Sequence, residues 1–331
     1  MKIVYITDIN LSKKSAAGIW TYMKHLVSIN KGIIIGKGDK ISLFPNSFVI
    51  APVVGNFLFH FYLFFRRDKI LSKGKVLHAQ RPDFLFWFRN NSEKRLIATL
   101  HGDPRLILSK KNMISFILYS IMEKKVLTKI EKLIFVSENT KHKYELRFPQ
   151  FSSKFIYVPV GIEVNKFEIS NNEKNSFIFI GRLAFEKQVD KIIKQYKTYN
   201  GSEKLLIIGT GPEEKKLKIH AINDSRIEFI GFVENEHLNV YFQRAKALLM
   251  YSITEGFPMV VLESLAAGVP IISTPVGQLP NIITPDTGVL TYDIVPAFEK
   301  IKCIKSSNCR KLAEEFDWNS VANKMNDIYS V

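Results

Sequence analysis

The chain has 331 residues, of which 46% are hydrophobic and 24% are charged, as in ordinary soluble globular proteins. This composition excludes intrinsic disorder, collagen-like repeats and a polytopic membrane protein, and the length predicts two domains. The 47 Lys and Arg residues outnumber the 31 Asp and Glu residues, and the net charge of +16 predicts an anionic partner. The whole excess lies in one half, because residues 1–165 hold 27 basic and 11 acidic residues whereas residues 166–331 hold 20 of each.

The first half of the chain has the pattern of an α/β domain. We expect strands at residues 3–6, 76–78, 96–100, 133–136 and 155–158, and helices at residues 18–29, 109–128 and 138–148. Asp8 and Asn10 end the first apolar run so early that it predicts no cleavable signal peptide. Two cysteines, Cys303 and Cys309, are too few for a disulfide framework or a four-cysteine zinc site, so we expect reduced thiols and a cytoplasmic protein.

Residues 48–65 form a nearly continuous apolar run that ends at Arg66 and Arg67. The run is close to the minimum length of a membrane span, but a proline, a glycine, an asparagine and a histidine interrupt it. We therefore expect a buried or interfacial segment rather than a transmembrane helix.

Aromatic residues and cations are interleaved throughout this basic half. A second aromatic cluster spans residues 84–88, and the expected helix at 109–128 carries two lysine pairs around an apolar middle. These patches predict docking onto an anionic membrane surface. The alternative is that residues 57–65 are buried core and the lysines are merely solvated. The sequence contains no recognised nucleic-acid-binding module, so we do not expect nucleic acid as a partner.

The second half alternates regularly between strands and helices. We expect strands at residues 177–180, 205–208, 227–230, 248–251, 271–273 and 289–290, with helices at 186–199, 213–222, 236–245, 258–267 and 279–283. This alternation predicts a doubly wound parallel sheet, whose ligands bind beyond the carboxyl ends of the strands. The sequence thus predicts domains at residues 1–160 and 161–315, and a final helix at 316–331 that crosses back to the first domain.

The strongest chemical signal in the sequence is the segment from Glu255 to Glu263. It follows a strand, turns through Gly256, and opens a helix with Pro258 at its first position. Backbone N–H groups at such a helix start suit a phosphate or a sugar hydroxyl, and two carboxylates at this spacing could hold hydroxyls at opposite ends of one ligand. The alternative is that Glu255 caps the helix and Glu263 is a solvated surface charge.

Four weaker signals also follow strands. Arg182 and Lys187 stand at a strand-to-helix junction where they could meet a diphosphate, although such a pair is often just surface. Residues 209–213 contain two glycines but lack the third glycine of the dinucleotide fingerprint, so they do not predict NAD binding. His101 could reach a ligand from the end of its strand, and Gly18 could allow close approach to one.

These segments resemble the retaining, nucleotide-sugar-dependent glycosyltransferases of the GT-B fold, the large group 1 family. The resemblance covers nearly all of residues 155–290 in the family's order, and it extends more loosely to the first domain. It is carried by Gly181-Arg182-Leu183 with Lys187, Ile208-Gly209-Thr210-Gly211-Pro212, Phe229-Ile230-Gly231-Phe232-Val233, Glu255-Gly256-Phe257-Pro258 with Glu263, and Ala267-Gly268-Val269-Pro270. The implied fold is two Rossmann-like domains facing across a cleft.

The resemblance also implies roles for the donor-binding residues. Arg182 and Lys187 would neutralise the diphosphate as it leaves, and Glu263 would hold the ribose hydroxyls. Because the family usually works without a metal, these cations and helix N-termini would supply the charge stabilisation. No metal or other cofactor is therefore expected beside the nucleotide-sugar substrate.

The remaining implied roles concern the sugar and the base. Glu255 would hold the transferred sugar together with the backbone of Gly256, Phe257 and Pro258. Other residues would border the donor: Gly231, Phe232 and Val233 at the base, His101 at the sugar from the other domain, and Gly18 by close approach. Ala17-Gly18 stands where the family often has Gly-Gly, which is a departure on the acceptor side.

The expected function is transfer of a sugar from a nucleoside-diphosphate donor to a hydroxyl, with retention at the anomeric carbon. Family habit and charge suggest a cell-envelope glycan or lipid-linked acceptor, such as a lipopolysaccharide or capsule precursor, at the cytoplasmic face of the membrane. Two alternatives stay open: a nucleotide-sugar epimerase of the same fold, and a basic nucleic-acid-binding protein.

Overall fold

The computed structural model describes residues 2–11, 18–30, 32–38, 47–51, 55–89, 93–170 and 173–330. The chain divides into two compact units, which are described separately. The first unit comprises residues 2–11, Ile19–Pro159 and the described residues from Val321 onward, and the second comprises Gly18 and Val160–Ser320. Ala16 and Ala17, which precede the predicted ligand-approach position Gly18, lie outside the described residues.

The first unit is built on a parallel sheet with the strand order β3-β2-β1-β4-β5-β6-β7. Its strands are β1 (Ile3–Asn10), β2 (Ile33–Lys37), β3 (Ser47–Ala51), β4 (Val76–Ala79), β5 (Arg95–Leu100), β6 (Lys132–Phe135) and β7 (Phe155–Tyr157). The order reverses between β1 and β4, as in a doubly wound fold. The sequence predicted five of these strands and missed β2 and β3.

The helices of the first unit differ from expectation in two places. They are α1 (Gly18–Asn30), α2 (Asn56–Phe65), α3 (Arg67–Leu71), α4 (Pro104–Lys111), α5 (Met113–Lys129) and α6 (Glu138–Arg147). The single helix predicted at 109–128 is wrong, because Asn112 leaves helical geometry and caps α5 by accepting a bond from Ser115 N at 3.0 Å. The apolar run at 48–65 divides between β3 and α2.

The second unit is a parallel sheet with the order β10-β9-β8-β11-β12-β13, which is the Rossmann arrangement of two halves around a first strand. Its strands are β8 (Ser176–Ile180), β9 (Lys204–Ile208), β10 (Ile227–Gly231), β11 (Ala245–Met250), β12 (Ile271–Ser273) and β13 (Gly288–Leu290). All six were predicted from continuous apolar runs, which are typical of strands covered on both faces.

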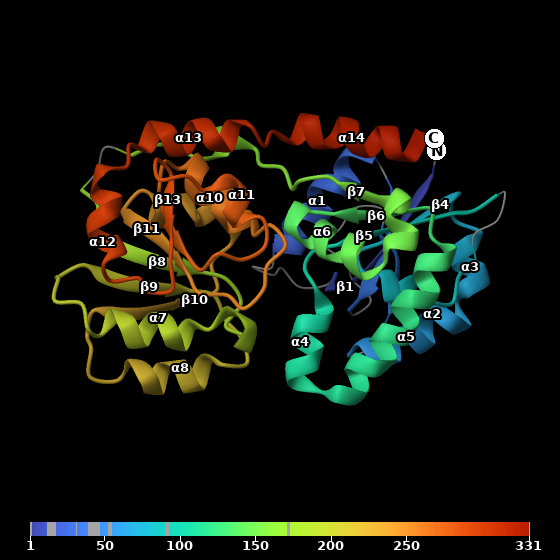
Figure 1. Ribbon diagram of the computed structural model, residues 1–331, viewed down its shortest axis with the longest axis horizontal. Helices are drawn as coiled ribbons and strands as arrows, with labels where there is room; N and C mark the ends of the chain where they lie inside the picture. The colour runs from blue at the N-terminus through green and yellow to red at the C-terminus, as the bar shows by residue number, and fades with distance from the viewer. Residues whose placement is uncertain are drawn as a thin grey trace. The chain divides into compact units, whose positions relative to one another are not determined.

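Helices cover both faces of the second sheet, with α7 and α8 on one side and α10, α11 and α13 on the other (Figure 1). They are α7 (Val189–Tyr196), α8 (Glu214–Ala221), α9 (Asn239–Phe242), α10 (Met259–Ala266), α11 (Leu279–Ile282), α12 (Ala297–Lys300) and α13 (Ser306–Glu314). Buried side chains such as Ile192 of α7, Leu217 of α8 and Phe298 of α12 pack with the strands into one core. The doubly wound fold predicted for both halves is therefore confirmed.

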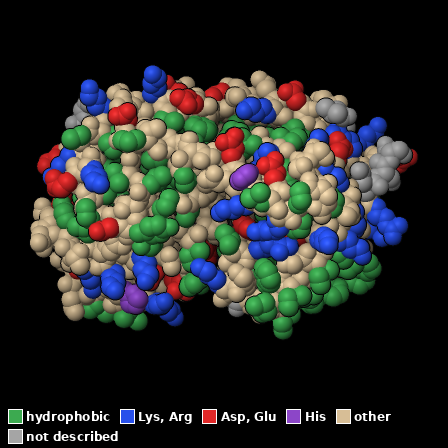
Figure 2. Space-filling view, viewed as in Figure 1, with side chains coloured by type: hydrophobic (Ala, Val, Ile, Leu, Met, Phe, Trp, Pro, Cys, Tyr) green, Lys and Arg blue, Asp and Glu red, His purple; other side chains and the backbone are tan. Residues whose placement is uncertain are grey.

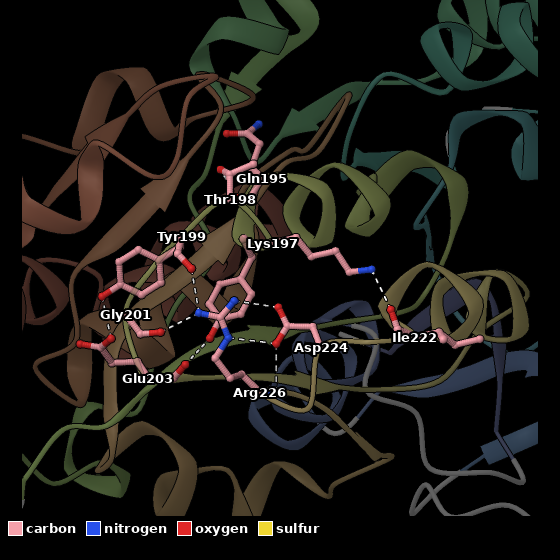
Figure 3. Close-up of polar contacts among 10 residues, drawn as sticks. Gln195, Lys197, Thr198, Tyr199, Gly201, Glu203, Ile222, Asp224 and Arg226 are labelled. Atoms are coloured by element: carbon pink, nitrogen blue, oxygen red, sulfur yellow. Dashed lines mark hydrogen bonds and ion pairs between the residues drawn. The ribbon is translucent and has the colours of Figure 1, made fainter.

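Polar contacts hold together the loops at the amino end of the second sheet (Figure 3). Arg226, just before β10, forms a two-point ion pair with Asp224 and donates to the carbonyls of Tyr199 and Gly201 at 2.7 and 2.6 Å. Tyr199 in turn donates to Glu203, just before β9, at 2.6 Å. These contacts satisfy backbone carbonyls at the end of the sheet opposite to the strand carboxyl ends, so we assign them a structural role.

The final helix, α14 (Trp318–Ser330), belongs to the first unit from Val321 onward. Its Tyr329 hydroxyl lies 2.6 Å from Nδ1 of the buried His78 on β4, and Arg95 of β5 donates to the carbonyl of Tyr329 at 2.6 Å. Burial lowers the pKa of His78 to about 3, so the imidazole is neutral at pH 7. These bonds fasten the end of the chain to the first sheet.

Substitution Tyr329→Phe is expected to lower the free energy of unfolding by about 1–3 kcal/mol, because it removes the hydroxyl partner of a buried imidazole nitrogen. A urea titration followed by circular dichroism measures the change. Tyr292→Phe, at a tyrosine that is 63% exposed, is the matched control and should shift stability by less than about 0.5 kcal/mol. Equal losses in both variants would contradict the assigned contact.

Candidate functional site

The candidate site lies at the carboxyl ends of β8 and β11, where the strand order of the second sheet reverses. In doubly wound sheets, this switch point is the place where the loops after two neighbouring strands diverge and leave room for a ligand. The loop after β8 contains Arg182 and Lys187, and the loop after β11 contains Glu255. The fold therefore brings two of the predicted motifs to one place.

Glycines allow the neighbouring strand-end loops to pack backbone against backbone. A Cβ at Gly209 would lie 2.0 Å from the carbonyl oxygen of Gly181, and φ at Gly209 is +129°. Gly277 has φ +57°, and a Cβ there would lie 2.3 Å from the carbonyl oxygen of Gly256. Residues with side chains cannot fit at these approaches. The glycines thus position the loops that carry Lys187 and Glu255.

Lys187 and Glu255 form an ion pair that joins the two loops. The same carboxylate oxygen of Glu255 also accepts a hydrogen bond from the Ser252 hydroxyl at 2.6 Å. The side chains of Lys187 and Glu255 are only 23% and 11% exposed. The alternative that Glu255 caps the following helix is wrong, because no side chain caps α10 and Glu255 faces Lys187 instead.

Arg182 is the more exposed of the two predicted cations. Its guanidinium pairs with the buried Glu186 one turn later, and its side chain is 59% exposed. Between Lys187 and α7 stands Gln188, which adopts the left-handed conformation with φ +45°. A non-glycine residue in this conformation is uncommon and is typical of functional loops. Here it ends the turn that carries Lys187.

Glu263 lies inside α10 and is buried. Its carboxyl oxygen accepts a hydrogen bond from the Asn235 side chain at 2.7 Å, and burial raises its pKa to about 7. The alternative of a solvated surface charge is therefore wrong. Pro258 stands at the N-cap of α10 rather than at its first helical position, which corrects the predicted helix start by one residue.

The predicted base-side turn lies at the end of β10. Gly231 closes the strand with φ +82°, and its carbonyl accepts a bond from Gly209 N at 2.7 Å. Phe232, which follows, is 40% exposed, so its ring is available to contact a ligand. Phe257 instead packs inward, with its ring 5.1 Å from that of Phe316.

His101 lies in the first unit, directly after β5. Its Nε2 atom is 2.7 Å from Oε1 of Gln80, which follows β4, and the edge of its ring meets Tyr22 at 4.9 Å. Burial lowers the pKa of His101 to about 4, so at pH 7 the ring is a neutral hydrogen-bonding group. Gly18 opens α1 in the same chain half. The roles predicted for His101 and Gly18 at the transferred sugar stay predictions.

The arrangement in the second unit suits an anionic ligand with hydroxyl groups. Lys187 and Arg182 offer cations at the strand ends, and the first N–H group of α10, that of Met259, lies four residues after Glu255. The buried carboxyl group of Glu263 can bond hydroxyls in a place that excludes water.

Sequence reasoning missed the partners of these residues. Ser252, Asn235 and Gln188 fix Glu255, Glu263 and the Lys187 turn, respectively. Ser252 follows the end of β11, so its place after a predicted strand was an available signal. Asn235 stands 28 residues from Glu263, and nothing in the sequence pairs them.

Glu263→Gln is expected to make the unliganded protein more stable at pH 8 by up to about 3 kcal/mol. Burial raises the pKa of Glu263 from 4.5 to about 7. Between these two pH values the folded state therefore binds more protons than the unfolded state. The free energy of unfolding of the wild type therefore falls as the pH rises from 4.5 to 7. The neutral amide does not titrate, and unfolding curves at pH 4 and pH 8 measure the difference.

The control is Glu315→Gln at an exposed carboxylate, which should give equal effects at both pH values. A pH-independent effect of Glu263→Gln would show that Glu263 is already ionised in the folded protein.

Residues 162–298 match the family model described as glycosyl transferases group 1. An uncharacterized glycosyltransferase of Methanocaldococcus jannaschii is 29% identical over 252 residues, which are 70% of this chain and 67% of that protein. The lipopolysaccharide 1,6-galactosyltransferase of Escherichia coli is 34% identical over 128 residues, which are 36% of each chain. The chain spans 67%, 50% and 46% of the lengths of the first three curated relatives that it matches.

Among solved structures, that of Anabaena HepE in complex with UDP and glucose is similar to this chain with a TM-score of 0.79 and 14% identity. The similarity covers 100% of this chain and 99% of that one. Together with the two Rossmann-like units it shows the GT-B fold. The family match and this fold support the glycosyl transferases group 1 family for this chain.

Proposed function

We propose that this protein transfers a sugar from a nucleoside-diphosphate sugar to a hydroxyl group of an acceptor, with retention at the anomeric carbon. The observation that carries the proposal is the ion pair of Lys187 and Glu255 at the switch point, beside the start of α10. A cation held by one carboxylate between two strand-end loops is placed for a ligand that brings its own negative charge.

In this proposal each chemical group of the nucleotide-sugar donor has a partner in the protein. The diphosphate replaces Glu255 as a partner of Lys187, and the exposed Arg182 adds a second cation. Glu263 accepts hydrogen bonds from the ribose hydroxyls, and these bonds offset the cost of its burial. Glu255, released from Lys187, is then free to accept bonds from hydroxyls of the sugar. Phe232 borders the base.

The chemical step needs charge stabilisation at the leaving group. The bond between the anomeric carbon and the diphosphate oxygen breaks, while the acceptor oxygen bonds the same face of that carbon. The acceptor proton passes to the departing phosphate oxygen. Lys187, Arg182 and the N-terminus of α10 meet the negative charge that develops on the diphosphate, so the proposal assigns this role to protein groups rather than to a resident metal.

The acceptor class rests on the relatives and on charge. One relative acts on lipopolysaccharide by its name, and the first half of this chain carries the whole net charge of +16. We therefore propose a cell-envelope glycan or lipid-linked acceptor and a cytoplasmic enzyme.

A nucleotide-sugar epimerase is the second candidate, because it would use the same donor site. A transferase releases nucleoside diphosphate in proportion to acceptor, whereas an epimerase forms a second nucleotide sugar without any acceptor.

Lys187→Ala and Arg182→Ala are each expected to lower turnover by orders of magnitude, because the diphosphate loses a cation as its charge develops. Nucleoside diphosphate release, measured in the presence of acceptor, gives the rate. Lys191→Ala, at an exposed lysine on α7, is the matched control and should retain the wild-type rate.

Near-normal rates for both variants would refute the proposed diphosphate clamp. Chelation with EDTA tests the metal-free part of the proposal separately, and it should leave the wild-type rate unchanged.

The stereochemical part has its own test. NMR of the first-formed product should show the anomeric configuration of the donor, because attack occurs on the face from which the diphosphate departs. Product of the opposite configuration would exclude retention while leaving the donor site in place.

A further inference from the structure

Helices α2 and α5 of the first unit each expose an apolar face. On α2 the exposed side chains recur at helical spacing, with Phe57, Leu58, Phe61, Phe64 and Phe65 between 43% and 77% exposed. On α5 they are Met113, Ile114, Ile117, Leu118 and Ile121, between 49% and 70% exposed. Large apolar side chains gathered in this way mark interaction surfaces in soluble proteins.

These faces are not the core of the unit. The core side of α2 is formed by Phe59 and Leu63, and that of α5 by Val126 and Leu127, all fully buried. The alternative that residues 57–65 are buried core is therefore wrong for most of the segment. The two helices meet the same short loop, since Phe64 of α2 contacts Trp87 at 4.8 Å and Lys125 of α5 lies 5.4 Å from the Phe86 ring.

Cations stand at the ends of both apolar faces. Lys110 precedes the exposed stripe of α5, and Lys124 and Lys125 follow it on the same face. Arg66 and Arg67 follow the stripe of α2. Of the two acidic residues of these segments, Glu123 is buried against Arg105, whereas Asp68 pairs with Arg67 and offsets that one cation. Figure 2 shows hydrophobic side chains gathered over α2 and α5 with Lys and Arg beside them.

We propose that the exposed faces of α2 and α5, here named the α2–α5 face, dock onto an anionic lipid bilayer. The apolar side chains would enter the boundary between headgroups and acyl chains, and the flanking cations would contact anionic headgroups. α5 has 17 residues and is thus about 25 Å long. Lys110 at the end of α4 precedes its apolar stripe, and Lys124 and Lys125 follow the stripe, so α5 would lie in the plane of the interface. In the part of the chain that the structure describes, no helix is long and apolar enough to cross a membrane.

Charge and side-chain type favour a bilayer over other occupants. Two copies paired through this face would set lysine and arginine clusters against each other, which disfavours a symmetric dimer. Single-stranded nucleic acid stacks on aromatic rings, whereas the exposed side chains of α5 are aliphatic. An anionic bilayer satisfies both the apolar stripes and the cations at their ends.

Vesicle flotation of the full-length protein tests the proposal with two vesicle types, phosphatidylcholine alone and phosphatidylcholine with phosphatidylglycerol. The wild type should bind the anionic vesicles, and more weakly as salt is raised. Phe65→Ser with Ile114→Ser should weaken binding by roughly tenfold or more for each lost side chain. Lys110→Glu with Lys124→Glu should weaken binding to anionic vesicles by at least about fivefold per lysine.

Matched controls lie on the second unit. Ile219→Ser with Ile222→Ser removes side chains that are 65% and 57% exposed, and Lys194→Glu with Lys215→Glu reverses two exposed lysines. Both controls should bind vesicles nearly as the wild type does. The substitutions on the α2–α5 face are at exposed positions, and circular dichroism checks that each variant is folded.

Three results would overturn the proposal. The first is no binding of the wild type to anionic vesicles at low salt, and the second is equal vesicle binding by the variants of the α2–α5 face and by the controls. The third is an oligomer that the Phe65 and Ile114 substitutions dissociate while vesicle binding persists. The assay contains no sugar donor, so its outcome is independent of the proposed transferase activity.

Discussion

The ion pair between Lys187 and Glu255 is the contact on which the candidate site depends. It joins the loops after β8 and β11 where the strand order reverses, and Ser252 fixes the same carboxylate. The pair holds the ammonium group of Lys187 in place, and this group can still bind a more highly charged anion. A bound diphosphate would compete with Glu255 for Lys187, so the site is organised before the ligand arrives.

The two halves of the chain differ in the balance and the position of their charged residues. In the second unit the cations of the site are paired with carboxylates, and the 20 basic and 20 acidic residues of residues 166–331 cancel. The excess of the first half includes cations at the ends of two apolar helical faces, α2 and α5. The excess positive charge therefore lies in the first half of the chain and not around the candidate donor site.

The sequence predicted the second sheet well because its strands are continuous apolar runs bounded by glycines and helices. It missed β2 and β3. The apolar part of β2 is only three isoleucines between glycines, and β3 is a short stretch of the 48–65 run, so neither carries a pattern that separates strand from loop. It also left the two faces of α2 undecided, because a helix with apolar residues on every side does not show which side is buried. Asn235 was unpredictable as the partner of Glu263, since only the strand order brings them together.

A calorimetric titration of the full-length chain with nucleoside diphosphates, comparing uridine, guanosine, adenosine and thymidine forms, tests most directly whether the switch point of the second unit is a donor site. At least one diphosphate should bind the wild type, and Lys187→Met should weaken it tenfold or more. Glu255→Gln should bind it at least as tightly as the wild type, because the amide no longer competes for Lys187. Failure of every diphosphate to bind, or binding that Lys187→Met leaves unchanged, would contradict this account.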